Sequence, residues 1–121
     1  MTTFVDLPGG TFLMGDDSPV SYPGDGEGPV HEVELSPFAI DAYTVTNARF
    51  AEFVDATGYV GEAEQYGWSF VFAGLLPDDF EDTAGVVGAE WWRQVFGADW
   101  RHPHGPQSSI DDVMNLSLIH I

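Results

Sequence analysis

The chain has 121 residues, of which 44% are hydrophobic and 14% aromatic, so it can form one folded domain or part of a larger one. Its 20 acidic residues outnumber three basic ones, and the formal net charge of −17 disfavours binding to nucleic acid or to an anionic membrane surface. The chain has no cysteine, which excludes disulfides, thiolate metal ligands and a cysteine nucleophile.

The first ten residues have neither the basic start nor the apolar stretch of a signal peptide. No apolar run approaches the ~20 residues that cross a bilayer. We therefore expect a cytoplasmic protein that does not enter a membrane.

The first third of the chain favours strands and a long loop. Two glycines followed by the apolar residues 12–14 predict a turn and a short buried strand. Proline, glycine and carboxylates over residues 16–29 predict a surface loop. Alternation over residues 31–35 predicts a half-buried strand, which resumes after a Ser-Pro break and extends from residue 38 to residue 45.

The clearest local prediction is a helix that begins near Thr46. Thr46 or Asn47 can cap the free amides of its first turn, and Gly58 suits a left-handed C-terminal cap. The apolar residues of this segment recur at helical spacing on one face: Phe50, Phe53 and Val54.

The rest of the chain favours short elements and long connections. Residues 69–72 predict a strand, and Trp91 and Trp92 form a further aromatic cluster. Strand pieces, one capped helix and Gly/Pro-rich connections indicate an α+β fold. In such loop-rich chains, function often lies on the loops.

The segment GADWRHPHGP allows two interpretations. His102 and His104 could bind a metal if an extended backbone placed both on one face, which the proline between them disfavours. In the alternative, the two prolines form a rigid turn that positions Trp100 and Arg101. We favour the turn and predict no metal site in this chain.

Two longer stretches, GYVGEAEQYGWSFVF and EWWRQVFGADWRHPHGPQSSI, resemble the formylglycine-generating enzymes, also called sulfatase-modifying factors. The parts GWSFVF and ADWRHPHGP are the more specific to that family. The parts GGTFLMG and YTVTNARFAEFV are shared with its wider superfamily. The resemblance covers residues 6–112.

The resemblance implies a fold and a reaction. Family members have a large, loop-rich α+β domain similar to C-type lectins. They oxidise a cysteine of a sulfatase polypeptide, within a Cys-x-Pro-x-Arg motif, to Cα-formylglycine with molecular oxygen. Their copper(I) is bound by two cysteines in the C-terminal half of the domain, where any calcium sites would also mostly lie. Because these copper ligands are absent from this chain, we expect no catalytic residue in it.

The resemblance also implies a groove for the substrate peptide. It suggests a hydrogen bond from Ser69, packing of Trp100 under the groove floor, and polar loop contacts from Arg101 and His102. Charge balance further predicts that Arg101 lies against a carboxylate. Core packing is the alternative role of each tryptophan. The expected substrate-binding residues are Ser69, Trp100, Arg101, His102, Pro103, Gly105 and Pro106.

The end of the sequence differs in character. We expect residues 1–112 to be the N-terminal part of the family's domain, and residues 113–121 to be an unrelated tail produced by truncation or frameshift. The alternative is a compact domain that ends there. Two other functions also stay open: a non-catalytic lectin-like module that binds peptide or protein, and a relative such as an iron-dependent sulfoxide synthase, which the segment ADWRHPHGP disfavours.

Overall fold

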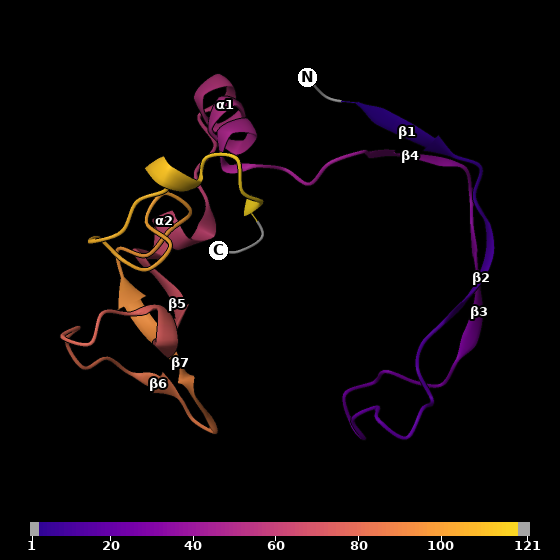
Figure 1. The fold of residues 1–121 in the computed structure, drawn as a ribbon, viewed down its shortest axis with the longest axis horizontal. Coiled ribbons are helices and arrows are strands. Elements are labelled where there is room, and N and C mark those ends of the chain that lie inside the picture. Colours follow the sequence, from indigo (N-terminus) through magenta and orange to yellow (C-terminus); the bar gives the residue numbers. More distant parts are fainter. Residues whose placement is uncertain (1–2, 119–121) are drawn as a thin grey trace. The chain divides into compact units, whose positions relative to one another are not determined.

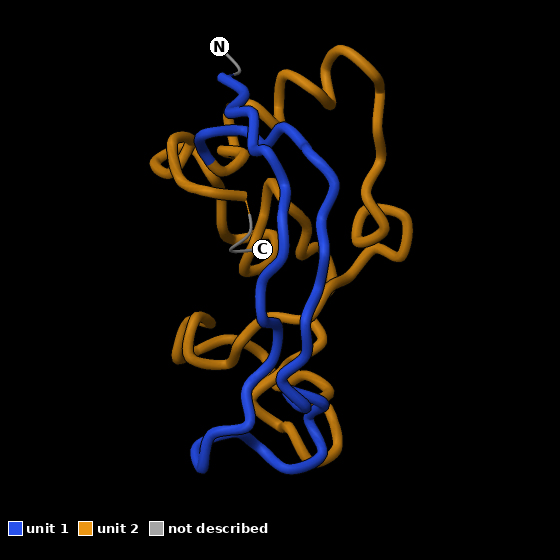
Figure 2. Tube along the Cα trace, turned by 90° about the vertical axis from the view of Figure 1, so that its right-hand side faces the viewer, with its two compact units in different colours: residues 1–43 blue, residues 44–121 orange. Residues whose placement is uncertain are grey.

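The computed structural model describes residues 3–118 (Figure 1). The chain divides into two compact units, residues 1–43 and residues 44–121 (Figure 2). Few helices and antiparallel sheets give a small mixed α/β structure, consistent with the α+β prediction, while the C-type-lectin-like fold stays a prediction. None of the helices within residues 3–118 has the length and apolarity that a membrane crossing needs.

The first unit is a ribbon two strands wide, in which one antiparallel pair follows the other (Figure 1). Gly9 joins the first two strands at a φ of 74°, and a Cβ there would lie 2.3 Å from the Leu35 carbonyl oxygen. Only glycine fits this turn without strain. The pairs are β1 (Phe4–Leu7) with β4 (Phe38–Asp41), and β2 (Gly10–Met14) with β3 (His31–Leu35).

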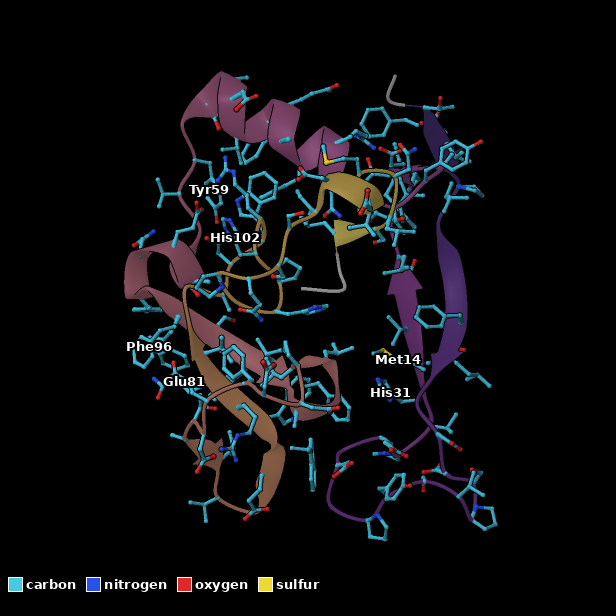
Figure 3. The ribbon with its side chains drawn as sticks, turned by 60° about the vertical axis from the view of Figure 1, so that its left-hand side comes forward. Met14, His31, Tyr59, Glu81, Phe96 and His102 are labelled. Carbon is cyan, nitrogen blue, oxygen red and sulfur yellow. The ribbon has the colours of Figure 1, made fainter. Side chains whose placement is uncertain are left out.

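The predicted strands over residues 12–14 and 31–35 and the loop between them are confirmed. The strand over residues 31–35 was predicted to be half-buried, which is wrong: all of it is exposed except Val33, which is partly buried. Met14 and His31 are opposite each other at the end of their pair (Figure 3), and the connection between them has no helix or strand. Within that loop, the Asp16 carboxylate accepts hydrogen bonds from the backbone N–H and from the hydroxyl of Ser18. These two hydrogen bonds, the backbone one first, lower the pKa of the Asp16 carboxyl.

Two further predictions for the first unit are wrong. Residues 12–14 form a strand, but their side chains are 44%, 70% and 52% exposed, because a two-stranded ribbon has no second layer within its own unit. The strand that begins at residue 38 does not reach residue 45. It ends at Asp41, whose carboxylate accepts the Tyr43 N–H at 3.3 Å and bends the chain.

The second unit contains two helices and a three-stranded antiparallel sheet. In this sheet, β7 (Ala89–Phe96) lies between β5 (Trp68–Phe72) and β6 (Gly85–Val86). The strand predicted at residues 69–72 is confirmed as β5, which is one residue longer. The elements are α1 (Asn47–Thr57), α2 (Glu62–Tyr66), β5 (Trp68–Phe72), β6 (Gly85–Val86) and β7 (Ala89–Phe96), with 3₁₀ turns at Ala73–Leu75 and Asp111–Val113.

The predicted helix is confirmed as α1, with both of its caps. The Arg49 N–H donates to Thr46 Oγ1 at 3.3 Å, and Gly58 has a left-handed backbone with a φ of 67°. Val54 is buried, whereas Phe53 is 44% exposed. The short helix α2 was not predicted, because five residues are too few to show a helical period.

Two small apolar clusters stabilise the second unit. Val54, Trp100 and Ile110 form the first, and Val71, Val95 and Ala98 form the second. Val113, Met114 and Leu118, which belong to the predicted tail, pack on the first cluster, and the Ala48 N–H of α1 donates to the Met114 carbonyl at 2.9 Å. The boundary at residue 112 stays a prediction.

Candidate functional site

A cavity of about 590 Å³ lies within the second unit. Two of the predicted substrate-binding residues, Ser69 and Trp100, line it together although they are far apart in the sequence. Its walls combine aromatic and acidic side chains, which suits an apolar group next to a polar or cationic one. The lining also includes Phe50 from α1, Tyr59 from the connection to α2, Glu62 and Glu64 from α2, and Asp99 after β7.

Trp100 is a buried wall of this cavity and is 8% exposed. Its ring meets Phe50 of α1 edge to face, with centroids 4.9 Å apart and an interplanar angle of 86°. Such aromatic pairs contribute roughly 0.5 to 1.5 kcal/mol beyond the area that they bury. Trp100 therefore belongs to the core and to the cavity wall at once.

Arg101 lies against a carboxylate, as charge balance predicts. Its Nη1 is 3.0 Å from Glu64 Oε1, and its Cζ lies 4.1 Å from the centre of the Trp100 ring. The side chains of Arg101 and Glu64 are 40% and 20% exposed, so solvent screens the pair only in part. An exposed pair contributes about 0 to 1 kcal/mol. The cation over the indole adds a second contact with a fixed geometry.

Asp99 fixes the turn from which Arg101 extends. One carboxylate oxygen, Oδ1, accepts the backbone N–H groups of Arg101 at 2.8 Å and His102 at 2.9 Å. The same oxygen is 3.1 Å from His102 Nδ1. His102 thus makes the polar loop contact expected of it, and Figure 3 shows it in the loop that follows β7.

Five of the seven predicted site residues do not line this cavity: Arg101, His102, Pro103, Gly105 and Pro106. Gly105 is buried with a φ of 106°, and a Cβ there would lie 2.8 Å from Val95 Cγ1. Pro106 packs on Gly97, where a Cβ would lie 2.6 Å from the proline Cγ. These contacts, together with Pro103, give the loop its shape. Arg101, His102 and Trp100 line a second cavity of about 390 Å³.

The chain does not fit the copper(I) site of the resembled family. It has no cysteine, and the described residues 3–118 contain no group of three His, Asp or Glu side chains placed to bind a metal. His102 Nδ1 already contacts Asp99. A soft cuprous ion prefers thiolates, so carboxylates cannot replace them.

Sequence reasoning missed Glu64 and Asp99. Glu64 stands three residues after Gly61, the spacing at which a glutamate caps the start of a helix, and that spacing was the available signal. Asp99 stands two residues before Arg101, the spacing of an Asx turn. Neither spacing indicates that both side chains reach the same cavity.

Comparison with known proteins identifies the family. Residues 1–121 match the family described as sulfatase-modifying factor enzyme 1-like domain. The formylglycine-generating enzymes of Thermomonospora curvata and Streptomyces coelicolor are 54% and 50% identical over 118 residues. The Bos taurus protein named inactive C-alpha-formylglycine-generating enzyme 2 is 47% identical over 119 residues.

These matches cover 97% of this chain but only 38% to 39% of each relative. The chain therefore spans well under half the length of the curated relatives that it matches. Relatives named as a formylglycine-generating enzyme and as an inactive one match it about equally well. The chain belongs to the sulfatase-modifying factor enzyme 1-like domain family.

Proposed function

We propose that this chain provides part of the peptide-binding region of a formylglycine-generating enzyme. In this proposal the complete enzyme oxidises the cysteine of a Cys-x-Pro-x-Arg motif in a sulfatase polypeptide to Cα-formylglycine with molecular oxygen. The observation that supports it most directly is the cavity lined by both Ser69 and Trp100, residues from the two segments that resemble the family most specifically.

The proposed role of this chain is to bind and orient the peptide. Phe50, Tyr59 and Trp100 offer aromatic surface to an apolar side chain of the peptide. Glu62 is exposed at the same cavity, and a net charge of −17 attracts a segment that contains arginine. In the complete enzyme, copper(I) would be bound by cysteines of the remaining part of the domain, and calcium, if bound, would also lie there.

A chimera tests the proposal. Residues 3–112 of this chain replace the matching segment of the Thermomonospora curvata enzyme, which is named formylglycine-generating enzyme and is 54% identical here. We expect the chimera, loaded with copper, to convert a Cys-x-Pro-x-Arg peptide to the aldehyde. The parent enzyme is the positive control. A chimera that melts cooperatively but converts no peptide contradicts the proposal.

Genomic sequence gives an independent check. We expect the gene of the complete protein to encode two closely spaced cysteines in addition to the residues of this chain. Such a pair supports the oxidase, because paired thiolates suit copper(I). A complete gene that encodes no such pair favours the non-catalytic peptide-binding module instead.

Arg101→Lys in the chimera separates binding from chemistry. Lysine keeps the charge but loses the planar fork that reaches Glu64 and the Trp100 ring. We expect peptide affinity to fall about fivefold to tenfold, the loss of one charge-assisted contact. Copper(I) affinity should stay unchanged, because the copper ligands lie outside this chain. Separate titrations of copper(I) and peptide measure both, and a variant that loses copper but binds peptide normally contradicts the assignment.

A further inference from the structure

The Glu64 side chain connects the start of α2 to the loop after β7 through two hydrogen bonds at this cavity. Its Oε2 accepts the Gly61 N–H at 2.8 Å at the start of α2, and its Oε1 lies 3.0 Å from Arg101 Nη1. One carboxylate thus uses one oxygen for the helix and the other for the loop. Its side chain is 20% exposed, so water competes only in part.

A series of contacts continues from Glu64 to α1. The Arg101 guanidinium lies 4.1 Å above the Trp100 ring, and Trp100 meets Phe50 of α1 edge to face at 4.9 Å. We call Glu64, Arg101 and Trp100 the clamp. Because Phe50, Glu64 and Trp100 all line the cavity, the clamp connects three of its walls.

Asp99 orients the Arg101 end of the clamp within the loop after β7. Its hydrogen bonds to the backbone of Arg101 and His102 fix the direction in which the Arg101 side chain leaves the chain. The ion pair with Glu64 then fixes the position of the guanidinium at the other end of the side chain. A charged group that is oriented from both ends loses little entropy when it forms its ion pair.

We propose that Glu64 is a positioning residue for the peptide site: through Arg101 it fixes the Trp100 wall of the cavity, and it takes no part in the oxidation. The role in peptide binding rests on the proposed function, whereas the contacts of Glu64 do not depend on it. It assigns to an acidic residue of a helix cap a role in substrate affinity.

The test uses Glu64→Gln in the chimera, with Glu52→Gln as the matched control. Both substitutions remove one negative charge from a helix of the second unit, but Glu52 is exposed on α1 and does not line the cavity. Glutamine at position 64 keeps one acceptor oxygen for the helix cap. We expect Glu64→Gln to raise the peptide KM about tenfold with kcat within twofold, as expected when a contact that binds ground and transition state alike is lost. Glu52→Gln should change neither value by more than about twofold.

A double-variant cycle and a measurement without substrate complete the test. The variant with both Glu64→Gln and Arg101→Gln should be no worse than Arg101→Gln alone, because the two residues act through one contact. The indole N–H resonance of Trp100, assigned with Trp100→Phe, should shift in Glu64→Gln and stay in place in Glu52→Gln.

The outcomes separate the two proposals. A folded chimera that turns over no peptide contradicts the proposed function, and the indole resonance then decides the role of Glu64 by itself. Equal effects of the Glu64 and Glu52 variants, an effect on kcat alone, or additive effects in the cycle overturn the positioning role.

Discussion

The chain of residues 1–121, purified alone, should unfold without a sharp cooperative transition. Its described residues include only six buried apolar side chains, whereas Phe12, Phe72 and Trp92 are each more than 40% exposed. Each large apolar side chain left in water forfeits ~1.5 to 3 kcal/mol. Because a whole domain has a net stability of only ~5 to 15 kcal/mol, a handful of such losses is enough to cancel it.

Thermal melting followed by circular dichroism, together with amide NMR spectra, measures this. We expect a broad melt, poorly dispersed amides and binding of a hydrophobic dye. The chimera serves as the control, because it joins residues 3–112 to the remaining part of a related domain. Well-dispersed spectra and a steep melt of the isolated chain would instead support the compact module considered from sequence.

The features that sequence predicted well are local ones. The helix α1 has a threonine cap, an apolar face and a glycine cap within thirteen residues, 46–58, so nearby residues alone specify it. The strands β2 and β3 likewise follow from short apolar and alternating patterns. Arg101 was assigned a carboxylate partner from charge balance, although the partner itself could not be named.

The features that sequence did not predict depend on distant parts of the chain. Glu64 and Arg101 are 37 positions apart, and no periodic pattern connects a helix cap to a loop. The predicted burial of residues 12–14 is wrong for a similar reason, because an apolar strand is buried only where a second layer covers it. Ser69 and Trp100 were predicted from family resemblance, and their shared cavity is a tertiary feature.

The isolated chain should also produce no formylglycine when it is incubated with copper, oxygen and a Cys-Thr-Pro-Ser-Arg peptide. It has no cysteine to bind copper(I) as a thiolate, and residues 3–118 bring no three His, Asp or Glu side chains together as a substitute. Mass spectrometry of the peptide measures the conversion. Because free copper and oxygen can themselves oxidise a thiol, a reaction without protein is the blank, and the chimera is the positive control. Aldehyde formed above the blank by the chain alone would mean that the oxidation does not need the thiolate pair, and the division between a peptide-binding part and a copper-binding part would then be wrong.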